Sequence, residues 1–356
     1  MTYRVIAWST GNVGKHAIVG IDANPELDLI GVYVSNPDKV GKDAGQLAGL
    51  GRDLGVLASS DAAALLAMKP DCIVHTAWVD DRLMEGLADL SSFLEAGINV
   101  VSSGPVFLQY PYGVADGLAK GVISAAENGG ASIFVNGIDP GFGNDTLPLM
   151  ITGISERIEE VRAFEICNYA TYNQASVLFD IMGFGKPMDE VPFLLQPGVP
   201  TLAWGSVIAI LAAGLGLELE RIEEWYERVP APEDLMTDAG PVAKGTVAGL
   251  HFELRGIVDG VPVVVLEHVT RLHDDLAPEW PQPAGASCYR VQVTGEPNYL
   301  LDLQLLGTDG DHNTAGLKAT AMRLVNAVPA VVAAAPGLVT ALDLPLITGK
   351  GLVRTR

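Results

Sequence analysis

The first 34 residues constrain the fold more than any other part of this sequence. Residues 3–8 are mostly apolar and predict a short buried strand, and the tight segment Ser9-Thr10-Gly11-Asn12-Val13-Gly14 follows directly. Residues 15–23 then have a helical pattern, and residues 27–34 predict a second strand. Strand, glycine-rich turn, helix and strand in this length make one βαβ unit, so we expect the two strands to lie parallel in one sheet.

The turn between the first strand and the helix has the composition of a phosphate-binding loop. Gly11 and Gly14 have no side chains, so the backbone can approach a pyrophosphate, and the helix N-terminus offers free N–H groups to the anion. The usual fingerprint is G-x-G-x-x-G, and Ser9 stands here at its first position. The alternative is an ordinary tight turn of an α/β domain. We predict a dinucleotide site formed by Ser9, Thr10, Gly11, Asn12, Val13 and Gly14.

The end of the second strand bears on which dinucleotide would bind. An NAD site usually has an acidic residue there, which binds the ribose 2′-hydroxyl. The sequence has Ser35, Asn36 and Lys39 instead, and these side chains suit a 2′-phosphate. Asp38 is a counter-signal, but it follows Pro37 in the turn. The pattern therefore favours NADP(H) over NAD(H).

The alternation of strands and helices continues to about residue 145. Strands are predicted at residues 55–59, 71–78, 98–103 and 132–136, and helices at residues 61–68, 81–96 and 116–128. This pattern is typical of a doubly wound parallel sheet, in which ligands bind beyond the carboxyl ends of the strands. Thr76 and Ala77, at the end of one such strand, complete the predicted cofactor site.

The second half of the chain has a different pattern. Long strands are predicted at residues 161–169, 244–258, 261–272, 287–294 and 299–306, with helices at 177–182 and 203–213. Runs of strands joined by hairpins predict an antiparallel sheet in an α+β domain. A long apolar helix is predicted at residues 314–335, with Pro329 as a kink or break.

Composition and charge exclude several classes of function. Acidic residues outnumber basic ones 43 to 22 among 356, a formal net charge of −21, which disfavours nucleic acid and anionic membrane surfaces as partners. Three separated cysteines predict neither a disulfide framework nor a zinc site, and we predict no bound metal. Residues 201–217 carry no charge but contain three glycines and are short for a membrane span, so a buried helix is predicted. Without a signal peptide, the expected location is the cytoplasm.

The motifs of hydrolases and of P-loop phosphotransferases are missing from the sequence, which leaves a nicotinamide oxidoreductase acting on a small molecule. Hydride transfer needs a proton donor beside the substrate. We take His75 as structural and His312 as an exposed loop residue. Loop packing is the alternative role for Tyr110, and helix capping for Asp139. The candidate proton donors are Tyr110, Tyr169 and Tyr172, and the candidate substrate contacts are Phe107, Asn136, Asp139, Phe142 and Asn168.

Three segments, together with the glycine-rich loop, carry a resemblance to a known family: VSNPDKVGKDAG (34–45), NGIDPGFGND (136–145) and VNAVPAVVAAAPG (325–337). Along nearly its whole length the chain resembles the dihydrodipicolinate reductase-like proteins, which include 2,4-diaminopentanoate dehydrogenase and the native amine dehydrogenases. The resemblance implies a Rossmann domain over residues 1–145, a substrate and dimerisation domain over 146–307, a C-terminal segment 308–356 that returns to the first domain, and a homodimer. The implied chemistry is NAD(P)H-dependent interconversion of a carbonyl compound plus ammonia with an amine.

The sequence departs from this family at one position that matters for the chemistry. Amine dehydrogenases of the family carry a glutamate after the strand that here ends at Ser103, where this sequence has Gly104-Pro105-Val106-Phe107. Glu165 lies on another predicted strand and would replace that glutamate only if the fold brought it there. The leading hypothesis is an NADPH-dependent reductase of a small, fairly apolar C=O, C=N or conjugated C=C substrate. The alternatives are a true amine dehydrogenase and a non-catalytic NADP(H)-binding sensor.

Overall fold

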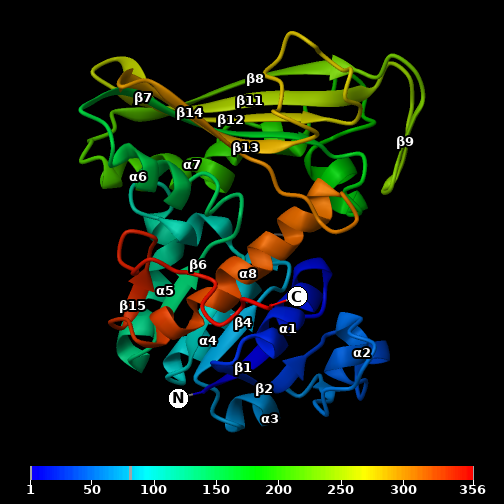
Figure 1. Cartoon of the computed structure of the whole chain (residues 1–356), viewed down its shortest axis with the longest axis vertical. Helices are drawn as coiled ribbons and strands as arrows, with labels where there is room; N and C mark the ends of the chain where they lie inside the picture. Colours follow the sequence, from blue (N-terminus) through cyan, green and yellow to red (C-terminus); the bar gives the residue numbers. More distant parts are fainter. Residues whose placement is uncertain (1, 80–81, 356) are drawn as a thin grey trace. The chain divides into compact units, whose positions relative to one another are not determined.

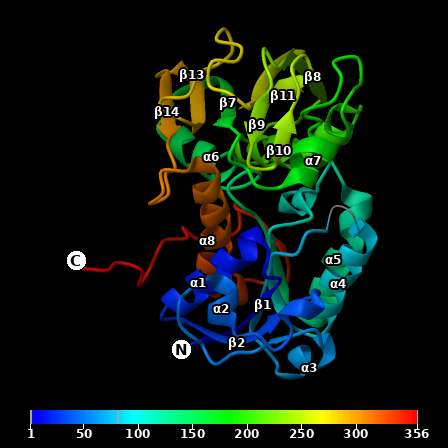
Figure 2. The ribbon, with the colours of Figure 1, turned by 90° about the vertical axis from the view of Figure 1, so that its right-hand side faces the viewer.

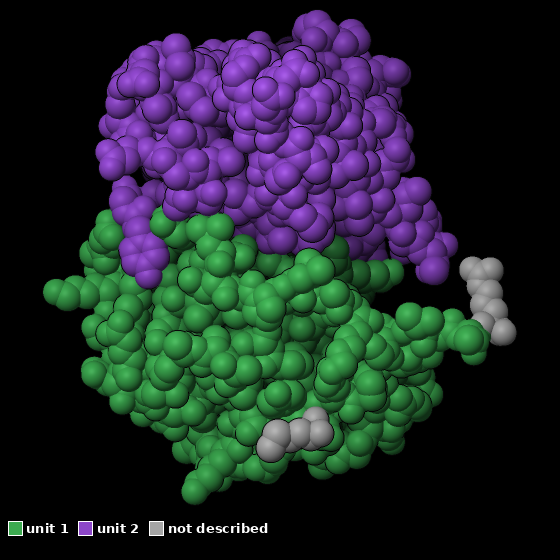
Figure 3. Space-filling model, turned by 60° about the vertical axis from the view of Figure 1, so that its left-hand side comes forward, with its two compact units in different colours: residues 1–111, 115–138, 317–356 green, residues 112–114, 139–316 purple. Residues whose placement is uncertain are grey.

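The computed structural model describes residues 2–79 and 82–355, and the chain divides into two compact units (Figure 3). Unit 1 consists of residues 1–111, 115–138 and 317–356, and unit 2 of residues 112–114 and 139–316. One boundary falls inside helix α8 (His312–Val332), after Gly316.

Unit 1 is built on a seven-stranded sheet in which every described pair of strands is parallel. The strand order is β3-β2-β1-β4-β5-β6-β15, which reverses direction between β1 and β4 as in dinucleotide-binding folds. The strands β4, β5 and β6 are short and almost wholly buried, as expected where helices cover both faces. Their bounds are Tyr3–Trp8 (β1), Leu27–Tyr33 (β2), Ala58–Ser59 (β3), Cys72–His75 (β4), Asn99–Ser102 (β5), Ser132–Val135 (β6) and Gly337–Val339 (β15).

Helices cover both faces of this sheet (Figure 2). On one face, α1 (Asn12–Ala23) and the unit 1 part of α8 share a core in which Ile18 and Leu324 are fully buried. The other face carries α4 (Leu83–Glu95) and α5 (Asp116–Gly129), which contact each other. The shorter helices α2 (Ala44–Ala48) and α3 (Ala62–Ala67) lie in the connections between β2 and β4.

The structure confirms the predicted doubly wound parallel sheet and corrects several details. The strand expected at residues 55–59 is only two residues long, and of the kink or break expected at Pro329 the break does not occur, because α8 continues through this residue. Strand β15 was not predicted, because three residues after a helix give too short a pattern. The helix expected at residues 81–96 would begin at Asp81, which lies outside the described residues.

Unit 2 is built on a six-stranded sheet in the order β14-β13-β7-β12-β11-β8. Helix α7 (Val199–Gly214) packs against β8, β11 and β12 (Figure 1); we call the face that it covers the inner face and the opposite one the outer face. The shorter helix α6 (Thr146–Thr152) and the two-stranded pair β9 (Leu235–Thr237) and β10 (Gly240–Val242) complete the main elements. The six strands span Arg157–Asn168 (β7), Arg221–Pro230 (β8), Val247–Val258 (β11), Val261–Arg271 (β12), Cys288–Glu296 (β13) and Tyr299–Leu303 (β14).

The predicted antiparallel sheet is present, with two differences. β7 and β12 pair in parallel, so the sheet is mixed. Strand β8 was missed because its sequence, RIEEWYERVP, is that of an edge strand with charged residues on both faces.

The uncharged segment 201–217 lies largely in α7, whose central residues are buried in the core of unit 2. None of the helices in the described part of the chain has both the length and the apolarity that a membrane span requires. The prediction of a buried helix in this segment is therefore confirmed.

Candidate functional site

The glycine-rich loop leads directly from β1 into α1, as predicted. Gly11 is the N-cap residue of α1, and no side chain caps this helix end, so its first N–H groups remain available to an anion. Ser9 has a φ angle of +97°, a conformation that glycine adopts freely and other residues rarely do. This explains why glycine is usual at the first position of the fingerprint and shows that Ser9 takes the same backbone path.

The two glycines of the loop have different reasons to be there. A Cβ atom on Gly14 would lie 2.3 Å from the Ser9 carbonyl oxygen and 2.9 Å from Thr76 Oγ1, so only glycine permits this close packing. A Cβ on Gly11 would have just one neighbour within 4 Å, Ser9 Oγ at 3.7 Å. Space is thus left open at Gly11, where a pyrophosphate would approach the backbone, and the loop fits a dinucleotide.

Lys39 extends from the end of β2 back to this loop. Its Nζ donates hydrogen bonds to Thr10 O (3.1 Å) and Thr10 Oγ1 (3.0 Å). Ser35, Asn36 and Asp38 are exposed, and Asn36 Oδ1 accepts a hydrogen bond from Asp38 N at 2.9 Å. Thr76 Oγ1 donates to Trp8 O at 3.3 Å, and Ala77 follows it. The sequence candidates for cofactor binding therefore lie around one loop of unit 1.

The other candidates in unit 1 have structural surroundings. Phe107 is buried on a short helix, and Tyr110 follows that helix. Asn136 is buried, and its Oδ1 accepts a hydrogen bond from Arg323 Nε at 2.9 Å. Burial lowers the pKa of His75 to about 3, so this imidazole is neutral, with Nδ1 2.9 Å from Ser102 Oγ.

A row of side chains crosses the inner face of the unit 2 sheet. Phe252 on β11 pairs with His268 on β12, His268 pairs with Glu165 on β7, and Glu165 pairs with Tyr289 on β13. Asp139, from the segment after β6, joins this row: its Oδ2 lies 3.1 Å from His268 Nε2. Carboxylate and imidazole atoms of Asp139, Glu165 and His268 all lie within 4.8 Å of one another. We call these three residues the acid group.

The acid group is buried, and its members influence one another's charge. The side chains of His268 and Asp139 are 3% and 2% exposed. Burial, followed by the negative charge of Asp139, raises the pKa of Glu165 to about 7. Burial opposes ionisation of Asp139, but the charge of His268 and a hydrogen bond from Trp204 Nε1 (2.7 Å) outweigh it and lower the Asp139 pKa. The same ion pair outweighs burial and raises the pKa of His268.

Tyrosines surround Glu165. Tyr169 donates a hydrogen bond to Glu165 Oε1, and Tyr289 lies opposite Glu165 on the neighbouring strand β13. The Tyr169 and Tyr172 rings stack with centroids 5.2 Å apart. Burial raises the pKa values of Tyr169 and Tyr289 and raises that of Tyr172 to about 12, so all three hydroxyls keep their protons. Two predicted proton donors therefore lie beside Glu165.

The remaining sequence candidates of unit 2 have partners outside this row. Phe142 packs with Leu147 and Val161 in a small core, and Asn168 Nδ2 donates to Asp274 Oδ1 at 2.7 Å. His312, which we expected in an exposed loop, is 6% exposed, with its Nε2 2.9 Å from Cys167 Sγ. That expectation was wrong, because His312 begins α8 and packs in unit 2.

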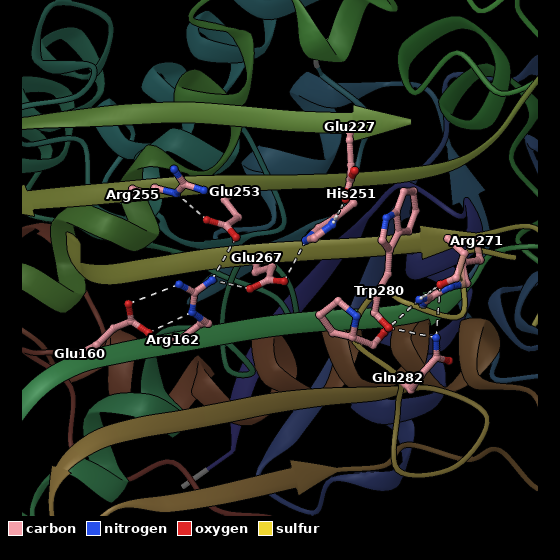
Figure 4. Close-up of polar contacts among 12 residues, drawn as sticks. Glu160, Arg162, Glu227, His251, Glu253, Arg255, Glu267, Arg271, Trp280 and Gln282 are labelled. Carbon is pink, nitrogen blue, oxygen red and sulfur yellow. Dashed lines mark hydrogen bonds and ion pairs between the residues drawn. The ribbon is translucent and has the colours of Figure 1, made fainter. Parts of the chain in front are cut away.

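A second charged group occupies the outer face of the same sheet (Figure 4). Arg162 Nη1 contacts Glu253 (3.1 Å) and Glu267 (2.5 Å), and His251 lies between Glu267 (2.8 Å) and Glu227 (2.9 Å). Although burial opposes it, hydrogen bonds from His251 and Arg162 lower the pKa of Glu267. Each of these carboxylates has a basic partner, so the charges of this network are paired within it. The acid group, by contrast, has two carboxyls for one histidine.

Sequence reasoning missed His268 and Tyr289 and gave Glu165 only a conditional role. The available signal was a charged or imidazole residue inside an apolar strand: Glu165 in VRAFEIC and His268 in VVVLEHV. Such residues are rarely buried without a partner. Which partner each has depends on the pairing of β7 with β12, about a hundred residues apart in the chain, and no local pattern shows that pairing.

Comparisons with known proteins agree with this architecture. Residues 142–352 match the model of the 2,4-diaminopentanoate dehydrogenase C-terminal domain. The chain is 41% identical over 346 residues to an amine dehydrogenase of Streptomyces virginiae, with 96% of each chain covered. It is 27% identical over 259 residues to 2,4-diaminopentanoate dehydrogenase of Acetoanaerobium sticklandii, covering 71% of this chain and 68% of that one.

A solved structure with the same fold is that of an amine dehydrogenase from Mycobacterium smegmatis. It superposes with a TM-score of 0.80 over 99% of both chains, at 24% sequence identity. Together with the family match, this confirms the resemblance inferred from the sequence. Of the hypotheses left open there, an oxidoreductase of the amine dehydrogenase type is the one that these relatives support. The chain belongs to the 2,4-diaminopentanoate dehydrogenase and amine dehydrogenase family of NAD(P)-dependent oxidoreductases.

Proposed function

We propose that this protein interconverts a small carbonyl compound plus ammonia with the corresponding amine, with NADP(H) as cofactor and Glu165 as the acid–base residue. The observation that carries the proposal is the acid group, which places a buried carboxyl with a pKa of about 7 in a unit typical of amine dehydrogenases. The family's glutamate position after β5 is filled by Gly104-Pro105-Val106 in this chain, so another acid has to take over its role.

The proposed chemistry needs one residue that takes up and releases protons repeatedly. Glu165 begins as a carboxylate and takes a proton from ammonium, and the ammonia released adds to the carbonyl carbon. The carboxyl returns that proton to the former carbonyl oxygen, takes another from nitrogen and passes it to the hydroxyl, which leaves as water. The restored carboxylate then stabilises the iminium by charge.

The cofactor completes the reaction. Bound NADPH would supply the hydride that reduces the iminium carbon. The overall balance is one carbonyl compound, one ammonium, one hydride and one proton giving one protonated amine and one water. A pKa near the working pH suits this repeated exchange, because both protonation states of Glu165 are then populated.

The surroundings of Glu165 favour a particular substrate class. The rings of Tyr169, Tyr172 and Trp204 offer apolar surface and aromatic faces, which attract an ammonium or iminium group. Asp139 and Glu165 together would repel a substrate carboxylate. We therefore propose small, fairly apolar aldehydes and ketones as substrates, in preference to keto acids.

Replacing Glu165 by glutamine tests the assignment of the acid–base residue. The amide keeps the shape of the side chain but accepts no proton, so ammonium-dependent NADPH oxidation with a ketone panel should fall by roughly 10²- to 10⁴-fold. Glu159→Gln is the matched control, because Glu159 lies on the same strand in an exposed ion pair with Arg157, and it should retain wild-type rates.

The outcomes of this assay separate the three functional hypotheses. Turnover that requires ammonium and is lost in Glu165→Gln supports the proposal. Turnover without ammonium would instead indicate a carbonyl or C=C reductase. NADPH binding without turnover on any aldehyde, ketone, imine or enone would indicate a sensor.

The preference for NADPH rests on Lys39, whose ammonium group lies at the glycine loop. Loss of one charge-assisted contact to a 2′-phosphate should cost about 1.5–3 kcal/mol. Lys39→Ala should therefore raise the KM for NADPH at least about tenfold and leave that for NADH within about twofold. Equal changes for both cofactors would contradict the assignment.

The proposed homodimer rests on the family resemblance. Light scattering coupled to size-exclusion chromatography of the full chain would test the dimer directly, with a mass of twice 37.4 kDa as the expected result.

A further inference from the structure

We propose that the His268–Asp139 ion pair positions Glu165 and sets its charge. The imidazolium of His268 offsets the negative charge of Asp139, so that the neighbouring Glu165 can also ionise. Both residues act through Glu165. This inference rests on the proposed function for its kinetic readout, and it makes a separate prediction about the imidazole that needs no turnover.

His268 is held firmly in place. Its ring stacks on Phe252, with centroids 4.8 Å apart and an interplanar angle of 16°, and Trp204 packs against it at 4.7 Å. The neighbouring Asp139 uses one oxygen for His268 Nε2 and the other for the Trp204 indole N–H. The face of the stacked Phe252 ring favours the imidazolium form of His268.

The charges in the acid group then follow from the contacts. The titratable groups that surround Glu165 come from several parts of unit 2. Asp139 lies in the segment after β6, His268 on β12 and Tyr289 on β13. Tyr169 and Tyr172 lie in the segment after β7, and Cys167 is on β7 itself. The Glu165 carboxyl lies within 4.8 Å of that of Asp139. Among these groups, only His268 carries a positive charge.

Two neighbouring buried carboxyls do not ionise together unless a cation offsets one of them. Without the imidazolium, Asp139 and Glu165 would share one proton to high pH, and Glu165 would not take a proton from ammonium. With it, Asp139 is neutralised as an ion pair, and Glu165 is left to exchange protons near neutral pH. The pair thus determines the pH range in which the enzyme works.

Variants of the two partners should shift the pH profile in opposite directions. His268→Gln removes the positive charge, so the acidic limb of kcat/KM for ammonium should move up by about one pH unit or more. Asp139→Asn removes the negative charge beside Glu165, so the limb should move down. The double variant should lie between them. Because the ionisation of ammonium is the same for every variant, it cancels in the comparison.

The outer face of the sheet provides the matched control. His251 is also a buried histidine between carboxylates, and it lies on the opposite face (Figure 4). His251→Gln should leave the pH profile of kcat/KM in its wild-type position. Equal losses of activity in the His268 and Asp139 variants, with no opposite shift of the limb, would overturn the proposal and leave both residues a packing role.

A measurement on the wild-type chain covers the case in which these variants do not fold. Nuclear magnetic resonance of isotope-labelled histidine should show the His268 imidazole still protonated at pH 7, because its pKa is raised, while His75 stays neutral down to about pH 4, in keeping with its pKa of about 3. A neutral His268 at pH 7 would contradict the proposal. Since this titration requires no turnover, it also separates failure of the ion-pair role from failure of the proposed reaction.

Discussion

At the scale of single residues, Ser9 replaces the first glycine of the dinucleotide-binding fingerprint and still adopts a backbone conformation that favours glycine. Ser9 has a φ of +97° although it has a Cβ, and its hydroxyl lies 3.4 Å from Gly11 N. A residue other than glycine in such a conformation stores about 1–3 kcal/mol of strain. The backbone path that a pyrophosphate needs is therefore maintained at some cost in stability.

This strain leads to a stability prediction. Ser9→Gly should raise the free energy of unfolding by about 1 kcal/mol, because relief of strain exceeds the added entropy of the unfolded chain. Thermal unfolding of the full chain would measure it, with NADPH protection retained. Ser35→Gly at an exposed position of the same region is the control and should be neutral or slightly destabilising. A loss of stability in Ser9→Gly would show that the serine hydroxyl matters more than the strain.

The partners of Glu165 could not be predicted from the sequence. Its position on a strand was predicted, but a buried carboxyl is tolerable only with partners, and those partners are His268, Tyr289 and Asp139. They come from three other segments of the chain. The chemistry of Glu165 is thus a property of the assembled sheet and not of its neighbours in sequence.

At the scale of elements, the register of the unit 2 sheet brings the acid group together. A shift of β12 by one residue would turn His268 to the outer face and bring Glu267 inward. The two adjoining strands at residues 244–258 and 261–272 were predicted, and the structure pairs them as the hairpin β11–β12, which turns at Asp259-Gly260. The parallel pairing of β7 with β12 was not predicted, because it joins strands distant in sequence.

The missed strand β8 has a role that can be tested. Glu224 on β8 accepts hydrogen bonds from Gly198 N (3.0 Å) and Thr201 N (2.8 Å), and so caps the N-terminus of α7, which has no cap of its own. Glu224→Ala should lower the free energy of unfolding by about 1–2 kcal/mol. Denaturant unfolding would measure this, with Glu223→Ala as the control, since Glu223 forms only a partly exposed pair with Arg221. Equal effects in both variants would refute the capping role.

At the scale of the whole molecule, the fold of unit 1 could be predicted from the sequence more completely than that of unit 2. Unit 1 follows a repeating strand–helix pattern whose parallel strands pair in an order common to such folds, so its fold and its glycine-rich loop could be predicted from local signals. Unit 2 depends on long-range pairing and on a charged edge strand. Its candidate tyrosines were identified, but the histidine between its carboxyls was not.

The buried acid group should make global stability depend on pH. The pKa of Glu165 is raised to about 7 from 4.5, so the folded state binds its proton more tightly than the unfolded state, and stability falls as pH rises. Between pH 5.5 and 8.5 this contributes a loss of about 2 kcal/mol. Calorimetry should show a smaller fall in Glu165→Gln than in the wild-type chain over this range. The same pH dependence in both proteins would contradict the shifted ionisation of Glu165.

Whether nitrogen from ammonium enters the product tests the proposed reaction most directly. The wild-type chain would be incubated with NADPH, ¹⁵N-labelled ammonium and a small aliphatic ketone, and the product examined by mass spectrometry. The proposed reaction predicts the ¹⁵N-labelled amine, formed in step with NADPH oxidation and almost absent with Glu165→Gln. An alcohol formed at the same rate with or without ammonium would contradict it.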